Sequence, residues 1–372
     1  MPDIDSVLIK HKKQQIQASD NNKRNLTLKS IILRVAVCLI TFPLIAAITL
    51  VGAVLILEYG PSQKARDLFV VSMMETSAAK FLATGFLGDD KVNEILAANS
   101  IKETDEITNT DLITIDPDNT EERDENEVIP GSDGQKVDPD GDGIDIVDVK
   151  GGTYKGKMMI VYDPSRVFVG ISGEFGVDKP GKIITDIYES YDNVVACVNG
   201  GGWDDRVGHG TGGEPWGIVI SEGEALWGLP PSTSWSCCAI DSNNKLIVGT
   251  MSIAKALDNG VRDACKYGPI LIVNGEATES LGTGGGLNPR TAIGQRADGA
   301  MLLLVVDGRQ SNSLGASFTD LQDIFFDFGA VNAYNLDGGS STSMIYNGEI
   351  VNQSASLVGL RRMCTTIMVR GK

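Results

Sequence analysis

The sequence predicts an α+β fold for the C-terminal domain, with mixed or antiparallel sheets and a few helices, preceded by one transmembrane helix and a helical stalk. Three observations support this prediction. Residues 35–57 carry no charge, and residues 64–98 repeat apolar side chains at helical spacing. After residue 153 the chain consists of short apolar runs separated by Gly, Pro and Asn, which is typical of strands that do not alternate strictly with helices.

The N-terminal apolar run, VAVCLITFPLIAAITLVGAVLIL, has 23 residues, and a bilayer core needs about 20. A secretory signal peptide is the alternative, but its apolar core has only about 7–15 residues and ends at a small-residue cleavage site. Seven Lys and Arg residues lie within residues 1–34, whereas only Lys64 and Arg66 follow the run closely. The positive-inside rule therefore predicts a cytoplasmic tail at 1–34, a span at 35–57 and an extracytoplasmic remainder.

A helical juxtamembrane stalk is predicted for residues 58–100, with a second short helix at 91–98. Residues 101–148 follow, with seventeen acidic side chains, three basic ones and few aromatics. Such a segment buries too little apolar surface to offset the entropy of ordering, so we expect a flexible acidic linker there. The chain has no basic patch, and its net charge of −17 argues against a nucleic-acid partner.

We predict no metal or other cofactor for this protein. Calcium is the alternative, because Asp138, Asp140 and Asp142 alternate along DPDGDGID as in the start of a calcium loop. The bidentate acid expected at the twelfth position is missing, since Val149 stands there. Five of the six cysteines lie after residue 190, and this odd number together with the absence of metal-ligand spacing favours buried free thiols.

Residues 149–372 form the predicted C-terminal domain. Helices are expected at 182–190, 252–258 and 318–328. The expected strands are 158–162, 166–170, 194–198, 217–220, 246–249, 270–273, 291–294, 301–306, 333–336, 343–346 and 365–369.

Four polar clusters follow or precede these apolar strands directly, at residues 199–205, 288–291, 307–309 and 337–342. Because strand ends are rigid, the loops that leave them can converge on one site. Glycines after Asp337 allow backbone N–H groups to approach an anion closely, and Arg290 offers a two-pronged donor to phosphate. Each cluster alone is more often a turn, but four together with an Arg and a Ser pair favour a site.

The stretches PRTAIGQRADGAMLLLVVDGR, NLDGGSSTSMIYNGEIVNQ and RRMCTTIMV resemble the phosphodiester glycosidase family. The resemblance covers about residues 150–370. The family's early asparagine-glycine motif usually ends in two aromatic residues, whereas this chain has NGGGWDD, with Gly202 and Trp203 at those positions. Asn199 and Gly200 of the motif are present.

The resemblance implies a hydrolase that splits the anomeric C–O bond of a sugar-1-phosphodiester in a cell-envelope or exopolysaccharide glycan. The carboxylates that we consider for catalysis are Asp337, Asp307, Glu276 and Asp205. The residues expected to bind substrate or phosphate are Arg290, Thr291, Asn199, Gly200, Arg309, Gly338, Gly339, Ser340 and Ser341. His209 is a pocket-lining candidate, and the glycine loop at 282–286 is expected to be a flap or a plain flexible loop.

Two other functions fit the same residues. One is a transferase that moves a sugar-phosphate polymer from a lipid carrier to the envelope, which would need more basic residues than Arg290 and Arg309 around its site. The other is an envelope module that binds glycans without turnover. The expected partners are a phosphodiester-linked glycan and the membrane, through the N-terminal helix.

Overall fold

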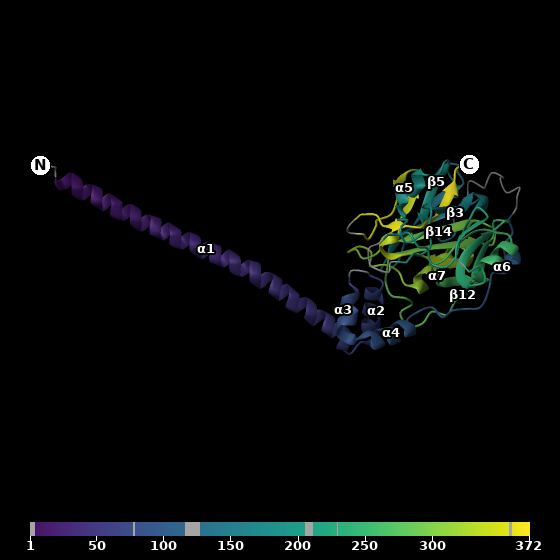
Figure 1. Ribbon diagram of the computed structural model, residues 1–372, viewed down its shortest axis with the longest axis horizontal. Helices are drawn as coiled ribbons and strands as arrows, with labels where there is room; N and C mark the ends of the chain where they lie inside the picture. Colours follow the sequence, from purple (N-terminus) through teal and green to yellow (C-terminus); the bar gives the residue numbers. More distant parts are fainter. Residues whose placement is uncertain (1–3, 77–78, 116–126, 205–210, 229, 357–358) are drawn as a thin grey trace. The chain divides into compact units, whose positions relative to one another are not determined.

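The computed structural model describes residues 4–76, 79–115, 127–204, 211–228, 230–356 and 359–372. It divides into two compact units, residues 1–61 and 62–372. The first unit is one continuous helix, α1 (Ile4–Tyr59), which contains Pro43 (Figure 1). Within α1, Lys29–Tyr59 is long and apolar enough to cross a membrane. The predicted tail and span therefore lie on the same helix.

The second unit begins with three short helices, α2 (Gln63–Met74), α3 (Lys80–Leu87) and α4 (Asp89–Ala98), which lie together in Figure 1. They form a small core of their own from Val70, Val71, Ala83, Val92 and Ile95. The sheets contribute no described residue to this cluster. The helical prediction for 64–98 holds, but the helix is interrupted after Met74 and the second helix begins at Lys80.

Three antiparallel sheets build the rest of this unit. The seven-stranded sheet has the order β1 (Ile144–Lys150), β2 (Lys155–Val161), β14 (Met301–Val306), β13 (Arg290–Arg296), β15 (Ala330–Leu336), β11 (Ile270–Val273) and β12 (Glu276–Ala277). One five-stranded sheet has the order β7 (Glu224–Trp227), β6 (Val219–Ser221), β10 (Val261–Cys265), β8 (Ser234–Asp241) and β9 (Leu246–Ser252).

The second five-stranded sheet has the order β17 (Glu349–Ile350), β16 (Met344–Tyr346), β5 (Val194–Asn199), β19 (Thr365–Arg370) and β3 (Val167–Ile171). A two-stranded pair joins β18 (Arg362–Met363) to β4 (Lys182–Ile183). The remaining helices are α5 (Ile184–Glu189), α6 (Ile253–Asp258) and α7 (Phe318–Asp327), and three 3-10 turns lie at Thr110–Leu112, Pro164–Arg166 and Gly339–Ser341. The α+β prediction is confirmed, and the described strand pairs are antiparallel throughout.

Both faces of the seven-stranded sheet are buried. On one face, Leu302 and Leu304 join a core with Phe325 of α7. On the other face, Leu303 and Val305 join a core shared with strands of both five-stranded sheets. Strands that are covered on both sides need apolar residues at every position, which explains the uninterrupted run of 301–306.

The prediction of a flexible linker at 101–148 is wrong for the residues that the structure describes. Residues 101–115 lie along the domain, where Ile113 is 1% exposed and the Thr108 hydroxyl accepts from Val248 N at 2.9 Å. Residues 144–150 form strand β1, which pairs with β2. A few apolar residues spaced between the acidic ones, including Ile101, Ile129 and Val137, provide the burial that the overall composition concealed. Residues 116–126 lie outside the described residues.

Candidate active site

The ends of three sheets meet at one place in the second unit. Arg290 begins β13 opposite Val306 at the end of β14, and Leu336 at the end of β15 pairs with Thr291. In the second five-stranded sheet, β5 ends at Asn199. Gly200 O accepts from Asp337 N at 3.0 Å, and Gly202 N donates at 2.8 Å to Lys266 O, just beyond β10. The polar clusters at 199–202, 288–291 and 337–342 therefore lie together, and their role as a functional site stays a prediction.

Asn199 joins two of these sheets through its side chain, which is almost fully buried. Its Oδ1 accepts from the Thr291 hydroxyl at 2.7 Å and from Ser343 N at 3.1 Å, and its Nδ2 donates to Asp337 O. A buried side chain with satisfied donors and acceptors holds its neighbours in fixed positions. Asn199 and Thr291 thus position the backbone of Asp337.

The Asp337 carboxylate lies just past the end of β15 and is partly accessible, although protein atoms surround it. Burial raises the pKa of Asp337 to about 6, while hydrogen bonds from the Ser341 hydroxyl and Gly338 N and the charge of Arg361 act in the opposite direction. The negative charge of Glu75 raises this pKa further. A carboxylate with such a pKa is largely ionised at neutral pH and yet basic enough to accept a proton.

The N–H groups of Gly338, Gly339 and Ser341 are engaged within the protein, so the glycines after Asp337 do not offer theirs to an anion as the sequence predicted. Gly338 N donates to the Asp337 carboxylate. Gly339 N donates to Pro289 O at 2.8 Å, and Ser341 N donates to Gly338 O at 3.2 Å. A Cβ atom at position 338 would lie 2.8 Å from Pro289 O, so Gly338 permits close contact between the loop and the start of β13.

Arg290 is 1% exposed, and all three of its nitrogen atoms are engaged. Its Nε donates to Ala316 O at 3.3 Å and its Nη2 to Gly285 O at 2.6 Å. Its Nη1 donates to both carboxylate oxygens of Glu75, at 2.9 and 3.1 Å. The guanidinium carbon lies 4.1 Å from the ring centroid of Phe318, which covers one face of the group.

Arg309 binds the backbone of the same residue, Glu75. Its Nη2 donates to Glu75 O at 3.0 Å and to Asn288 Oδ1 at 3.2 Å. Its Nη1 lies 3.3 Å from the place that a Cβ atom of Gly339 would occupy, so Arg309 borders the loop that follows Asp337. Burial lowers the pKa of Arg309, and the charge of Glu75 opposes this effect. Two guanidinium groups therefore converge on one carboxyl residue of the stalk.

Glu75 is a residue of this region that the sequence did not indicate. It follows α2 immediately, and the stalk is fastened to the glycine loop at 282–286 and the residue after it. Ser72 Oγ accepts from Leu287 N at 3.1 Å, and Asn99 Oδ1 accepts from Thr283 N at 2.8 Å. No local sequence pattern marks a carboxylate in a short stalk as part of this region. Only the folded chain brings Glu75 to Arg290, which lies 215 residues later in the sequence.

Comparisons with known proteins give a family match and a shared fold. The sequence profile of the phosphodiester glycosidase family matches residues 192–370. This segment belongs to the phosphodiester glycosidase family. The catalytic domain of zebrafish N-acetylglucosamine-1-phosphodiester alpha-N-acetylglucosaminidase, auto-inhibited by its pro-peptide, has the same fold, with a TM-score of 0.51 and 23% identity over 62% of this chain and 82% of that chain.

A curated relative is the SPbeta prophage-derived uncharacterized protein YomE of Bacillus subtilis (strain 168), which is 29% identical over 168 residues. The match covers 42% of this chain and 25% of the relative, so the chain spans about a quarter of the length of that protein.

The other carboxylates predicted for the phosphodiester glycosidase domain have different positions. Asp307 lies at the same sheet edge as Arg290, but its Oδ1 accepts from Asn352 Nδ2 at 3.0 Å and Gln353 N at 2.9 Å, which indicates that it holds that loop. Glu276 is exposed on the edge strand β12. It pairs with Val273, which lies at the end of β11 that is far from Gly268 and Asp337. The prediction that Glu276 belongs to the site is therefore wrong. Asp205 and His209 lie outside the described residues.

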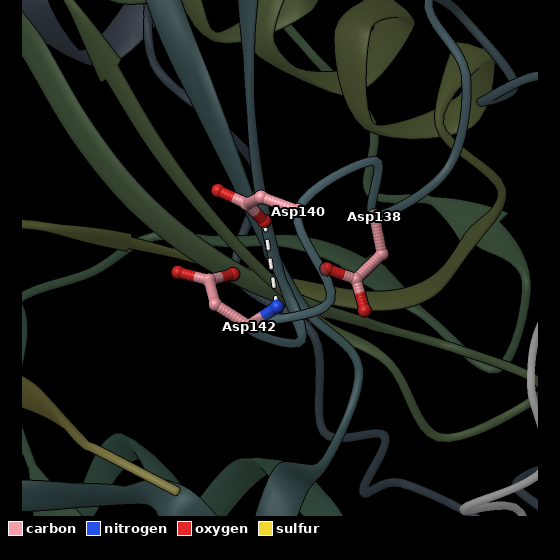
Figure 2. Close-up of side chains that lie close together, drawn as sticks. All are labelled: Asp138, Asp140 and Asp142. Atoms are coloured by element: carbon pink, nitrogen blue, oxygen red, sulfur yellow. Dashed lines mark hydrogen bonds between the residues drawn. The ribbon is translucent and has the colours of Figure 1, made fainter.

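The acidic loop before β1 places three carboxylates near one another. Oxygen atoms of Asp138, Asp140 and Asp142 lie within 4.8 Å of each other (Figure 2). Asp140 Oδ1 accepts from Asp142 N at 3.3 Å, and Asp142 Oδ1 accepts from Ile144 N at 2.7 Å. Carboxylate oxygens at these distances suit a calcium ion. Val149 lies within β1, so the chain enters a strand where a calcium loop would close. Calcium at this loop stays the alternative to the prediction of no cofactor.

Proposed function

We propose that this protein hydrolyses the glycosidic C–O bond of a sugar-1-phosphodiester. The observation that carries this proposal is that Asp337, Arg290 and Arg309 belong to one group of strand ends, where Glu75 binds both arginines and its charge also raises the pKa of Asp337. Family membership of residues 192–370 supports the same reaction.

The chemistry follows from the leaving group. When the bond between the anomeric carbon and the phosphate oxygen breaks, a phosphate monoester departs with its electron pair and an oxocarbenium-like centre develops on the sugar. Phosphate leaves readily, so the main requirement is a set of fixed positive charges around it, which the two arginines would supply. Ionised Asp337 would then attack the anomeric carbon or take the proton of the attacking water.

In the arrangement described, Glu75 takes the place that we assign to the phosphate. The Glu75 carboxylate lies against Arg290, and the Glu75 backbone carbonyl lies against Arg309. An incoming phosphodiester therefore has to displace Glu75. The helices that carry Glu75 have their own small core, so they can leave without opening the core of the domain. The zebrafish relative, whose catalytic domain is auto-inhibited by its pro-peptide, gives a precedent for a latent state. We infer that the α2–α4 stalk holds this enzyme latent.

The test compares the full chain in detergent with Glu75→Gln and with Glu94→Gln, an exposed carboxylate of α4 as the matched control. Release of sugar and phosphate monoester is measured for a panel of sugar-1-phosphodiesters. We expect Glu75→Gln to raise kcat/KM by about tenfold, because residue 75 would then compete with the phosphodiester for the arginines less strongly by ~1.4 kcal/mol. A fall in kcat/KM would contradict latency and make Glu75 part of the machinery. If neither protein forms either product, the hydrolase proposal is wrong.

We also propose that α1 anchors the protein in the cell membrane as a single span at about residues 35–57, with the catalytic domain outside the cytoplasm. The apolar segment Lys29–Tyr59 and the basic residues before it support this topology. Protease added to intact protoplasts should remove the domain and spare the tail. Cleavage of the tail with a protected domain would reverse the orientation. Release of the domain without its apolar segment, in the absence of added protease, would indicate a cleaved signal.

A further inference from the structure

Trp216 is a partly exposed aromatic residue beside the site. Its side chain is 43% exposed, and its ring stacks on that of Tyr267 with centroids 5.7 Å apart and planes inclined by 9°. Tyr267 stacks on one face of the indole and is itself only partly accessible. A rigid indole backed by a second ring is a ready surface for an apolar ligand face.

Gly202 fixes both rings to the backbone of the site. Trp216 N donates to Gly202 O at 2.9 Å, and Gly202 N donates to Lys266 O at 2.8 Å, one residue before Tyr267. A Cβ atom at position 202 would lie 2.8 Å from Trp216 Cε3 and 2.6 Å from Tyr267 Cδ2. The glycine that replaces an aromatic residue of the family motif therefore makes room for this ring pair.

The ring pair and Asp337 are attached to the same two segments. Gly200, two residues before Gly202, accepts from Asp337 N. Gly268 N, next to Tyr267, donates to Asn335 O at 3.0 Å, and Asn335 Nδ2 donates back to Gly268 O at 2.7 Å. Asn335 precedes Asp337 by two residues. In agreement with this proximity, the pKa of Tyr267 is raised by burial and by the charges of Asp337 and Glu75, and lowered by those of Arg290 and Arg309.

We propose that the exposed face of Trp216, supported by Tyr267, stacks on the C–H face of the pyranose ring of the substrate. This inference rests on the proposed function. It places the phosphate of the substrate at the two arginines and the sugar on the side of Asp337 where the ring pair lies. A pyranose presents axial C–H groups on one face, and these bind a π surface while the hydroxyl groups stay hydrated. Trp216 would then determine which sugars bind, without taking part in bond cleavage.

The test uses the full chain with Trp216→Ala, Trp216→Met and Trp216→Phe. Steady-state kinetics on the sugar-1-phosphodiester are combined with inhibition by inorganic phosphate, which probes the arginine subsite alone. We expect Trp216→Ala and Trp216→Met to raise KM at least about fivefold, the scale of one aromatic contact. Their kcat and phosphate inhibition should change little, because the reacting groups are untouched. Trp216→Phe should restore most of the affinity. Equal KM values for Met and Phe, with matching melting curves, would overturn the proposal.

A binding readout separates this inference from the hydrolase proposal. Saturation-transfer NMR on the free monosaccharide, with the wild type and Trp216→Met, reports contact between sugar C–H protons and the protein without turnover. If no protein hydrolyses the diester but the signal depends on Trp216, the proposed reaction is wrong and the sugar platform stands. If hydrolysis proceeds and the signal does not depend on Trp216, the platform alone is wrong.

Discussion

Arg290 Nη1 donates to both carboxylate oxygens of Glu75, which precedes it by 215 residues. The same guanidinium uses Nε and Nη2 to bind backbone carbonyls of residues 316 and 285. Arg290 therefore has two tasks: it holds the glycine loop at 282–286, and it presents one nitrogen to an anion. The stalk supplies that anion in this structure, and under the proposed function the substrate would supply it during turnover.

Asp337→Asn should separate catalysis from stability. Loss of the charge should lower kcat by about 10² or more, the scale of an acid–base contribution. The same change should stabilise the protein above about pH 6. In the wild type, the pKa of Asp337 is raised from 3.8 to about 6 in the folded state. The wild type therefore loses up to ~3 kcal/mol of its free energy of unfolding as the pH rises from 4 through 6, because the buried carboxyl group has to ionise.

Denaturant unfolding at pH 4 and pH 8, alongside steady-state rates, measures both effects. The variant should show less difference between the two pH values than the wild type. Near-normal turnover with an intact fold would mean that Asp337 only holds its own turn.

The pH dependence of kcat/KM should report the Asp337 carboxylate. Activity should rise as the group ionises, with its midpoint at about pH 6 and a plateau at higher pH. Arg361→Met removes a charge that lowers this pKa, so the inflection should move to higher pH. Arg296→Met is the control, because Arg296 lies at the opposite end of β13 and pairs with Asp298. An unchanged inflection in Arg361→Met would assign the profile to another group.

Arg290→Lys should be poorly tolerated in both activity and stability. An ammonium group cannot reproduce bonds to two separate carbonyls and to an anion at once. We expect a higher KM, a lower kcat and a loss of ~1.5–3 kcal/mol in the free energy of unfolding, the scale of a hydrogen bond to a charged group. Arg309→Lys should affect substrate binding with a smaller loss of stability. Thermal melting with kinetics of both variants tests the difference, and full activity in Arg290→Lys would contradict it.

Ile113→Ala should destabilise the domain although position 113 lies in a segment predicted to be a flexible linker. Ile113 is 1% exposed, so the truncation should cost ~2–5 kcal/mol. Leu112→Ala is the matched control, because that neighbour is 42% exposed and should change stability by less than about 0.5 kcal/mol. Chemical denaturation of both variants measures the difference. Equal stability would restore the linker interpretation for residues 101–115.

The sequence predicted strands best where both faces of a sheet are buried, as in Met301–Val306. It failed for β8, Ser234–Asp241, because serines and cysteines interrupt the apolar run, and for β1, Ile144–Lys150, because its aspartates were attributed to the linker. Asn199, Thr291 and Asp337 were predicted together since each lies at a strand end. Glu75 and Tyr267 were missed, because their places in the site depend on long-range packing that periodicity does not encode.

The contacts of residues 101–115 with the domain determine how the stalk would return after release. Lys102 N donates to Glu279 O, and Thr108 N donates to Val248 O, so the chain stays attached from Ile101 onward when α2–α4 moves away. Glu75 would then remain tethered at an effective concentration on the order of millimolar, whatever the amount of protein in solution. Dilution would not activate the enzyme. The substrate concentration needed to displace Glu75 would depend on the 25 residues between Glu75 and Ile101. Shortening or lengthening that tether would change this concentration.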